Sequence, residues 1–351
     1  MVKRDETIDQ LRGLAIFWVI VVHVLYWGNF FDNNYINTIK SFCLFEMPLF
    51  FFLTGASNSF SKIDGYFKFI FKRFKRILIP YWFFALICAG LSVAHLAIKE
   101  GMNVAIAIEV LVSWLIPVDS QITKISYLTW ALWFVPVYLC VILIVPFLKR
   151  IKQCKNQVYF LSALLAIFVI MCIFDLGWIQ NVVFYSFWTY IGLFYTDIIL
   201  WLKNHKFRKF LGLVVLIGIV AIFIFAVMGQ PIDMQDNKFP PNLMFGLFSI
   251  VAMSLIILGI PLIKKGYECI CKYKLIRKIA HLFSTRSMTV FLYQAFAFNV
   301  TIRIANRLPF GNGDIMSFVK AAVCLITTVL FCAVLSLAFG KIEDFGVEGH
   351  K

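Results

Sequence analysis

The stretch IDQLRGLAIFWVIVVH, residues 8–23, joins a short polar start to a long apolar run that holds one arginine and one histidine. The apolar run continues to residue 31, so a helix over 11–31 is long enough to cross a hydrocarbon core of roughly 30 Å. No small-residue cleavage site follows a short apolar core here, which favours a permanent first span over a cleavable signal.

Similar stretches recur along the whole chain. The 351 residues are 62% hydrophobic and 15% charged, whereas a soluble domain carries roughly 45–50% apolar and about 25% charged residues. We therefore predict an all-α membrane protein, a polytopic bundle of about ten transmembrane helices. The predicted spans are 11–31, 42–60, 77–98, 128–148, 157–174, 180–202, 210–228, 242–263, 286–303 and 316–340.

The segment 104–118 is apolar but too short to cross the bilayer as a helix. It contains Glu109 and ends near Pro117. We therefore predict an interfacial or re-entrant helix here.

The distribution of basic residues predicts the orientation. Of the 33 Lys and Arg, 26 fall in the two terminal tails and in the loops 61–76, 149–156, 203–209 and 264–286, and 7 fall on the opposite side. Cytoplasmic loops carry an excess of Lys and Arg, so we predict that both termini are cytoplasmic. One more span in the middle of the chain would break this alternation, so the charge pattern also supports ten spans.

No long Gly/Ser-rich linker, internal repeat or low-complexity tract interrupts the spans. We therefore predict a single integral membrane domain over residues 1–351. Any catalytic group must then lie in the helix bundle or in a short loop.

The net charge of +15 would suggest a nucleic-acid partner in a soluble protein. Here the positive-inside pattern accounts for it, and no nucleic-acid partner is expected. The C-x-C pair Cys269 and Cys271 has no second pair to complete a zinc site, so no metal is expected. Five of the other cysteines lie inside predicted spans, where they pack as small apolar residues: Cys88, Cys140, Cys172, Cys324 and Cys332.

Arg12 and His23 are eleven residues apart in the first span. In a helix this is about three turns, so both lie on nearly one face and are ~16 Å apart along the axis. A histidine near mid-membrane is costly and usually faces a cavity or a partner. Histidine also suits general base chemistry near neutral pH. The alternative is a histidine satisfied by a neighbouring helix.

Arg12 and His23 together resemble the Arg-x10-His pattern of the membrane-bound acyltransferase 3 family. MPLFFFLTGA (47–56) is similar to the family's apolar-FF-x-x-Ser-Gly segment, and RFKRILIPYW (73–82) to its R-x-x-R…P-x-Y loop. ALWFVPVYL (131–139) looks like the subgroup of fucose O-acetylases. The second half resembles the family in its hydropathy and in the phrases KFPPNL (238–243) and FLYQ (291–294).

The resemblance implies a multi-pass enzyme of the bacterial cytoplasmic membrane. It implies transfer of an acetyl group from cytoplasmic acetyl-CoA to a hydroxyl of a cell-surface or lipid-linked sugar, with His23 as the general base. The expected partners are acyl-CoA, a carbohydrate acceptor and the lipid bilayer. Whether transfer is direct or passes through a covalent acyl-enzyme stays open at this level.

Arg73 and Arg76 directly precede the third predicted span, whose first turn contains Pro80. The start of a helix offers free backbone N–H groups to a phosphate, and arginine adds bidentate contacts. Given the resemblance, we expect Arg73 and Arg76 to bind the phosphates of acyl-CoA, and Arg12 to enter the same cytoplasmic mouth. The alternative is an ordinary positive-inside anchor.

Glu46 lies near the predicted outer end of the second span, within about two turns of His23 in depth. It is a candidate to orient the imidazole and to stabilise its charged form. Relatives often have histidine in a similar FHMPLFF phrase, so Glu46 departs from the family pattern, and the alternative is a carboxylate hydrated at the outer interface. Two further departures are Gln294, where relatives often have histidine, and Thr54 in place of serine.

Two other functions fit a polytopic bundle with intramembrane polar residues. The first alternative is a transporter or flippase for a polar lipid-linked sugar, and the second is a polysaccharide polymerase. A transporter does not need acyl-CoA recognition, so the Arg12–His23 pair together with the arginine loop favours the acyltransferase. A polymerase would more often have a long charged outer loop, and 99–127 is sparsely charged.

Overall fold

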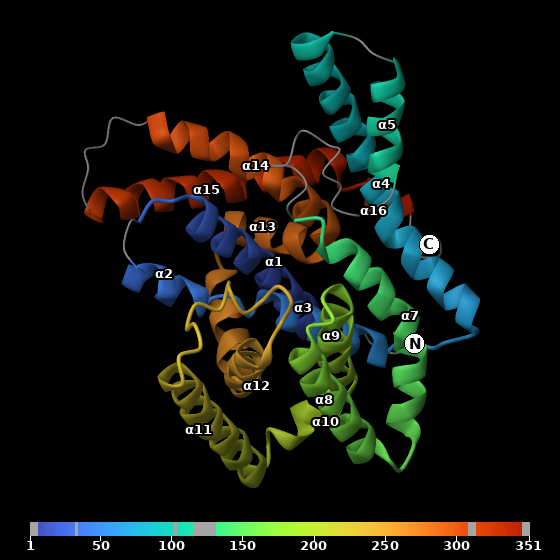
Figure 1. Ribbon diagram of the computed structural model, residues 1–351, viewed down its shortest axis with the longest axis vertical. Coiled ribbons are helices and arrows are strands. Elements are labelled where there is room, and N and C mark those ends of the chain that lie inside the picture. The colour runs from blue at the N-terminus through green and yellow to red at the C-terminus, as the bar shows by residue number, and fades with distance from the viewer. Residues whose placement is uncertain (1–5, 32–33, 102–103, 116–130, 308–313, 346–351) are drawn as a thin grey trace. The chain divides into compact units, whose positions relative to one another are not determined.

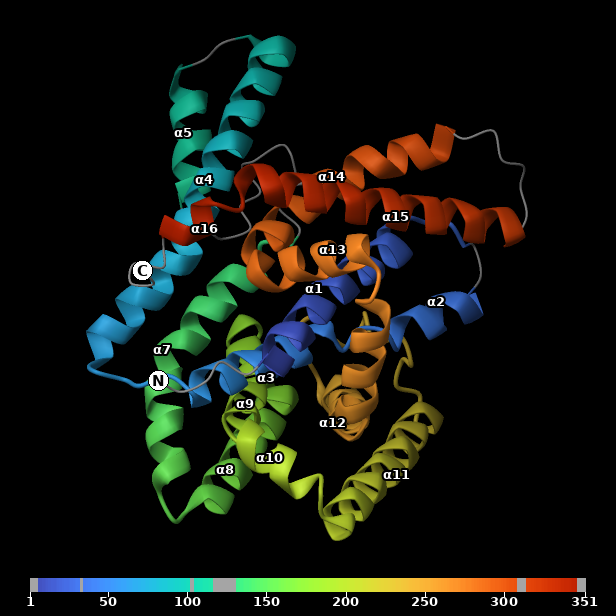
Figure 2. The same cartoon turned by 180° about the vertical axis from the view of Figure 1, so that it is seen from behind.

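The computed structural model describes residues 6–31, 34–101, 104–115, 131–307 and 314–345, and within these ranges it contains helices and no strand (Figures 1 and 2). Nine of the described helices are long and apolar enough to cross a membrane, and the number reaches ten if the bent pair α9–α10 is one span. The predicted all-α, polytopic membrane fold is confirmed. The chain divides into two compact units, each built from two separate segments of sequence.

Unit 1 comprises residues 1–62 and 143–284. Its helices are α1 (Glu6–Trp27), α2 (Asn34–Ser41), α3 (Glu46–Ser59), α8 (Gln157–Phe174), α9 (Trp178–Leu193), α10 (Tyr195–Trp201), α11 (His205–Val227), α12 (Leu243–Ile270) and α13 (Lys274–Thr285). The helix α7 (Phe134–Gln153) enters this unit at residue 143.

The centre of unit 1 is the close crossing of α3 and α9. Gly55 and Gly192 face each other's helix, and a Cβ atom at either position would overlap the partner backbone, at Thr189 or Phe52. Beside this crossing the rings of Phe51 and Tyr185 stack with centroids 4.4 Å apart. The glycine of the MPLFFFLTGA phrase therefore serves helix packing.

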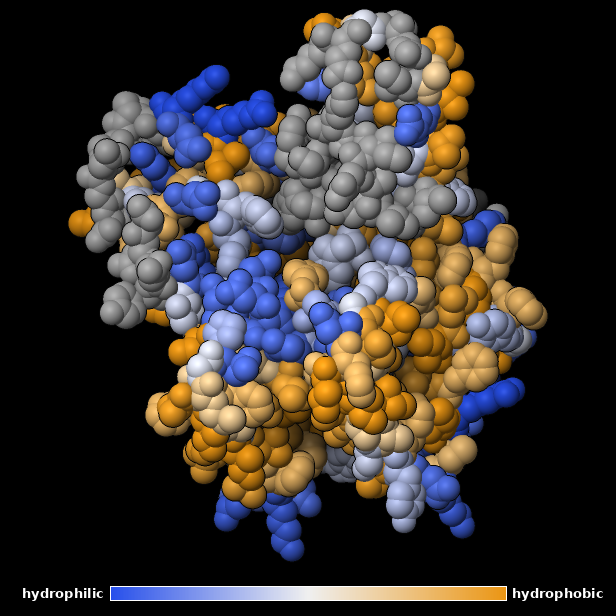
Figure 3. Space-filling model, in the orientation of Figure 1, coloured by the Kyte–Doolittle hydropathy of each residue, from blue (hydrophilic) through white to orange (hydrophobic). Residues whose placement is uncertain are grey.

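The outer surface of unit 1 has the character of a lipid-facing belt. The helices α8 and α11 are mostly exposed although they are highly apolar. Figure 3 shows this hydrophobic surface ending in projecting hydrophilic side chains at one end of the unit. Exposed lysines precede or begin α8 and α11, as anchors do at a membrane interface: Lys155, Lys203 and Lys206.

Unit 2 comprises residues 63–142 and 285–351. Its helices are α4 (Tyr66–Glu100), α5 (Val104–Leu115), α14 (Ser287–Arg307), α15 (Asp314–Phe339) and α16 (Ile342–Phe345), together with the first part of α7. The helices α14 and α15 lie side by side in both ribbon views and are joined by a 2.6 Å hydrogen bond between the hydroxyls of Thr301 and Thr328.

The predicted non-spanning segment 104–118 contains α5, which has 12 residues. This is shorter than the roughly 20 residues that a spanning helix needs. It folds back along α4, where the hydroxyl of Tyr81 donates to the carbonyl of Trp114 at 2.9 Å and the indole of Trp82 donates to that of Leu115 at 3.0 Å. A short helix packed on a long neighbour fits the predicted re-entrant element.

Two predicted loops are largely helical instead. α4 begins at Tyr66, so most of the expected loop 61–76 belongs to a 35-residue helix that contains Pro80 in its interior. α12 continues to Ile270, and the amphipathic helix α13 fills most of the rest of the expected loop 264–286. In both places the basic residues predict a loop, whereas the structure has a regular helix.

Candidate functional site

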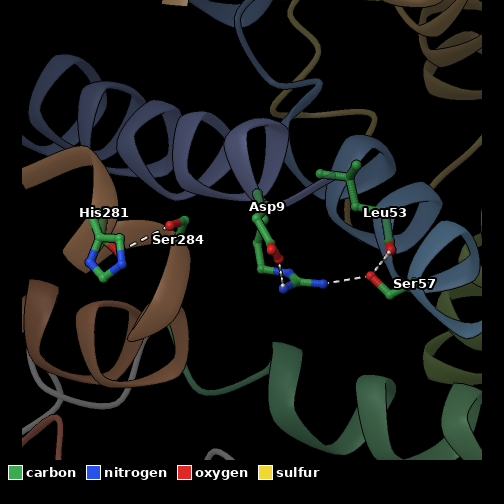
Figure 4. A network of polar contacts seen from close by, with 6 residues as sticks. Asp9, Leu53, Ser57, His281 and Ser284 are labelled. Carbon is green, nitrogen blue, oxygen red and sulfur yellow. Dashed lines mark hydrogen bonds and ion pairs between the residues drawn. The ribbon is translucent and has the colours of Figure 1, made fainter. Parts of the chain in front are cut away.

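Arg12 lies near the start of α1, which is one continuous helix from Glu6 to Trp27. Its side chain is 16% exposed, and its guanidinium donates from Nη1 to the carboxylate of Asp9 at 3.1 Å and from Nη2 to Oγ of Ser57 at 2.5 Å (Figure 4). The Ser57 hydroxyl donates in turn to the carbonyl of Leu53 at 2.8 Å, which fixes its lone pairs toward the arginine. The antiparallel helices α1 and α3 therefore hold Arg12 in a defined orientation.

The helix α13 closes on the same end of α1. A Cβ built at Gly13 would lie 3.3 Å from the carbonyl oxygen of Ala280 and from Ser284, so glycine permits this approach. Figure 4 shows His281 and Ser284 on α13, beside the arginine end of α1. The sequence does not point to His281, because the basic residues around it predict a loop.

His23 lies eleven residues beyond Arg12 on the same helix and is half-buried. Because α1 is unbroken, the predicted spacing of ~16 Å and the shared face hold. His23 falls between two points where α1 contacts the segment before α3. The indole of Trp18 donates to the carbonyl of Cys43 at 2.9 Å, and the ammonium of Lys40 donates to the carbonyl of Leu25 at 3.2 Å.

These two contacts place Glu46 in depth relative to His23. Glu46 follows Phe45, whose ring stacks on Trp18 with centroids 5.3 Å apart. By its position next to Phe45, Glu46 lies near the level of Trp18, which is five residues or ~7 Å along α1 from His23.

The alternative of a hydrated Glu46 at the outer interface is wrong. Glu46 is the first residue of α3 and lies well inside the candidate span Ile36–Ser59. Its side chain is only 2% exposed, and Oε1 lies 2.5 Å from the ammonium of Lys238, which is 6% exposed. A carboxylate at this depth is costly unless it is paired, and Lys238 supplies the pairing.

Lys238 lies in the loop 228–242, and hydrogen bonds hold this loop in place. The side-chain amide of Asn237 donates to the carbonyls of Pro231 and Asp233 at 2.8 and 2.7 Å. Asn242 caps α12 by accepting from the backbone of Phe245 at 3.1 Å. The amide of Gln180 on α9 donates to the carbonyl of Pro241 at 2.6 Å and so fastens the loop to the bundle.

The second oxygen of the Glu46 carboxylate, Oε2, is buried and has no hydrogen-bond partner among the described residues. Asp233 belongs to the same loop as Lys238, and burial raises the pKa of its carboxyl above the ordinary value. An unsatisfied buried acceptor in such surroundings marks a place where a ligand or an ordered water binds.

Sequence reasoning missed Lys238, because a single lysine in a predicted outer loop carried no signal for a contact with α3. The one available signal was its place in the KFPPNL phrase. The structure shows what this phrase does: it carries the cation, the carbonyl of Pro241 that holds the loop, and the cap of α12.

In unit 2 the premise behind Arg73 and Arg76 needs a correction. Because α4 begins at Tyr66, both residues lie inside the helix and their backbone N–H groups do not mark a free helix start. Only the side chains remain for phosphate binding. Both are half-buried, and the guanidinium of Arg73 lies over the ring of Phe69 at 5.4 Å.

Arg76 lies near a buried carboxylate. Glu343 on α16 accepts from the backbone N–H and the hydroxyl of Thr289, both at 2.6 Å, and so caps the start of α14. Burial raises the pKa of Glu343, while the Thr289 hydrogen bonds and the positive charges of Arg76 and Arg286 lower it in part. The charge of Arg76 is therefore partly offset inside unit 2.

Next to Glu343, the guanidinium of Arg286 forms a bidentate pair with Asp344 at 2.5 and 2.7 Å. This pairing lowers the pKa of Asp344. The two pairs fasten α16 to the start of α14.

No metal site emerges from the described residues: no group of three or more His, Cys, Asp or Glu side chains there is arranged to hold an ion.

A family model described as an acyltransferase domain matches residues 5–337, nearly the whole chain. The chain belongs to the acyltransferase 3 family. It is thus a multi-pass membrane acyltransferase. A search of curated proteins and a search of solved structures found no match to the chain.

Two positions at which this acyltransferase departs from the common family pattern are buried. Thr54 donates its hydroxyl to the carbonyl of Phe50 at 3.0 Å, one turn earlier in α3. Gln294 lies within α14 of unit 2 and is 2% exposed. The hydroxyl of Thr54 is therefore used within its own helix.

Proposed function

We propose that this acyltransferase moves an acetyl group from cytoplasmic acetyl-CoA to a hydroxyl of a cell-surface or lipid-linked sugar, in the bacterial cytoplasmic membrane with both termini cytoplasmic. The family match supports acyl transfer, and the excess of basic residues supports the orientation. The similarity of ALWFVPVYL (131–139) to fucose O-acetylases favours a sugar acceptor.

The observation that carries the proposal is the continuity of α1 between Arg12 and His23. A guanidinium held at one end by Asp9 and Ser57 can bind a phosphate of acyl-CoA. We propose that an extended thioester arm brings its acyl group to His23, three turns further along α1. Arg73 and Arg76 of unit 2 are proposed as further phosphate ligands.

In the proposed reaction the acceptor hydroxyl attacks the thioester carbonyl, a C–O bond forms and the C–S bond breaks. His23 takes the hydroxyl proton as general base and returns it to the departing thiolate. In the covalent route the acyl group passes first to a group of the enzyme, with release of the CoA thiol, and then to the acceptor hydroxyl. Single-turnover kinetics without the acceptor separate the two routes, because only the covalent route releases free CoA thiol in a burst.

Glu46 has a modified role in this scheme. Its pairing with Lys238 offsets the carboxylate charge, so Glu46 stabilises a charged imidazole less than an isolated carboxylate would. Its second oxygen, Oε2, is left to accept a hydrogen bond from the acceptor.

The test measures transfer of labelled acetyl from acetyl-CoA in membranes that contain the native glycan. We expect His23→Ala to lower the rate by about 10²–10⁴, the usual contribution of a general base. His95→Ala is the matched control, because His95 is a half-buried histidine in α4 of the other unit. His95→Ala is expected to leave the rate unchanged at equal protein level.

A transporter for a lipid-linked sugar remains the competing function, because an intramembrane ion pair such as Glu46–Lys238 also occurs along substrate pathways. Absence of transfer by the wild type with the native acceptor present would favour the transporter. Equal transfer by wild type and His23→Ala would keep the enzyme and remove the role of His23.

A further inference from the structure

The helix α13 connects α12 and α14, which are both long and apolar enough to cross the membrane. α13 has 12 residues, too few to cross the bilayer itself. It therefore lies at one surface of the membrane. Its last turns are fixed within unit 1, because Phe283 and Ser284 are buried and Ala280 and Ser284 pack closely on Gly13 of α1 (Figure 2).

The sequence of α13 separates apolar from basic side chains around the helix axis. At 3.6 residues per turn, five apolar side chains fall within an arc of about 120°: Leu275, Ile276, Ile279, Leu282 and Phe283. The opposite arc carries Lys274, Arg277, Lys278 and His281. A short helix with this division suits a position in the plane of the membrane surface, with its apolar side toward the lipid.

The first half of α13 is exposed on both of these sides. Leu275 and Ile276 are 63% and 41% exposed, and Tyr273, directly before the helix, is 70% exposed. Lys274, Arg277 and Lys278 are exposed as well. Apolar side chains flanked by basic ones fit the boundary between lipid headgroups and acyl chains, where an amphipathic helix buries its apolar side to a depth of ~5–10 Å.

The positive charge of this region is not neutralised within the chain. From residue 264 to residue 278 the chain carries six exposed basic side chains and one acidic residue, Glu268. None of the six forms an ion pair with a described residue: Lys264, Lys265, Lys272, Lys274, Arg277 and Lys278. A cluster of roughly four to eight Lys and Arg residues at the end of a spanning helix or on an amphipathic helix attracts anionic lipids.

We propose that the first half of α13 is a binding site for anionic phospholipids. Lys274, Arg277 and Lys278 contact the lipid phosphates, and Leu275 and Ile276 lie among the upper parts of the acyl chains. The bound lipid holds α13 at the membrane surface and so supports its contact with Gly13. This inference does not rest on the proposed function.

The apolar side of α13 favours a lipid over a nucleic acid as the anionic partner. A nucleic acid would contact the basic side chains and leave Leu275 and Ile276 exposed. An anionic lipid contacts both kinds of side chain, and it is present at the membrane surface where α13 lies.

The test uses two phospholipid probes with the same diazirine-bearing acyl chain, one with a phosphatidylglycerol head and one with a phosphatidylcholine head. The purified full chain is reconstituted in phosphatidylcholine nanodiscs that contain a trace of one probe, irradiated and digested. Mass spectrometry then quantifies the label on residues 271–282. We expect the phosphatidylglycerol probe to label this segment at least about fivefold more than the phosphatidylcholine probe, since each basic residue near an anionic surface strengthens attraction by about this factor.

The triple variant Lys274→Gln/Arg277→Gln/Lys278→Gln is expected to lose this preference, so that both probes label the segment equally. The control Lys206→Gln/Arg208→Gln/Lys209→Gln removes the same charges from exposed positions of α11 and should keep the wild-type preference at 271–282. Leu275→Gln/Ile276→Gln keeps the charge and is expected to lower the labelling of this segment by both probes.

Equal labelling of residues 271–282 by the two probes in the wild type would overturn the proposal, because α13 would then contact lipid without regard to its charge. Absence of label from both probes would also overturn it and would leave a nucleic acid or a soluble acidic protein as the partner of the basic side chains. An equal loss of preference in the α11 control would assign the effect to the total charge of the protein instead of α13. Unchanged labelling in Leu275→Gln/Ile276→Gln would contradict the insertion of the apolar side.

Discussion

The ammonium group of Lys238 lies 2.5 Å from the carboxylate of Glu46 inside unit 1, although 192 positions of sequence separate the two residues. The pair joins the loop before α12 to the first residue of α3. It neutralises two charges that would each be costly to bury alone, and among the described residues it leaves the buried Oε2 atom of Glu46 without a hydrogen-bond partner.

Removal of one partner of this pair is expected to destabilise the protein more than removal of both. Lys238→Met leaves an unpaired buried carboxylate, at a cost of about 3–5 kcal/mol, whereas the double variant Glu46→Gln/Lys238→Met recovers most of this loss. Thermal unfolding in detergent, followed by tryptophan fluorescence, measures the stability of both variants. Lys264→Met, at an exposed position of α12, is the control. A single variant as stable as the wild type would contradict the pairing.

Arg12→Lys is expected to raise the KM for acetyl-CoA about tenfold, corresponding to ~1.4 kcal/mol, because lysine keeps the charge but loses the planar fork. Ser57→Ala removes one group that orients the guanidinium and should raise KM in the same direction by a smaller factor. Ser59→Ala is the matched control, since the Ser59 hydroxyl donates to the carbonyl of Ala56. Steady-state kinetics measure the KM for acetyl-CoA of each variant. An equal rise of KM in Ser59→Ala would count against a specific role for Ser57.

Arg73 and Arg76 are expected to differ in a measurable way. Arg73→Gln should weaken acetyl-CoA binding with little effect on stability. Arg76→Gln should weaken binding and also lower the thermal midpoint, because its charge offsets part of the burial cost of Glu343. Lys72→Gln, at an exposed position of the same helix, controls for general loss of positive charge. Identical behaviour of the two arginine variants would refute the distinction.

Glu343 predicts a pH dependence of stability. Burial raises its pKa in the folded protein, so between the ordinary glutamate value and the raised value the folded state keeps a proton that the unfolded state has lost. The contribution of this group to the unfolding free energy therefore falls as pH rises through that window. Glu343→Gln keeps an acceptor for Thr289 and does not titrate. Its stability relative to the wild type should rise across the window, and parallel pH profiles would show that Glu343 is not responsible.

Hydropathy alone predicted most of the fold, because a helix in lipid must satisfy its backbone internally and its length follows from the bilayer. The helical start of α4 was missed although the sequence carries a signal for it. Gly65 adopts a φ of 132° directly before Tyr66, and no proline or glycine follows until Pro80. The basic residues of this stretch suggested a loop, whereas they lie on an ordered helix.

The site was predictable only in part. The spacing of Arg12 and His23 follows from helix geometry, which is local. The contact of Arg12 with Ser57 and that of Glu46 with Lys238 depend on how distant helices and a long loop pack, and spacing along the chain carries no information about this.

The pair Glu46–Lys238 also sets an order of assembly. At a synthesis rate of about 5–20 residues per second, α3 leaves the ribosome roughly 10–40 s before Lys238 does. Glu46 therefore enters the bilayer without its counter-ion, at a cost of several kcal/mol. The α11–α12 hairpin must insert and place its loop before this cost is relieved. The loop 228–242 therefore completes the ion pair late in synthesis. A chain whose synthesis stops before this loop would hold the Glu46 carboxylate in the membrane without its counter-ion.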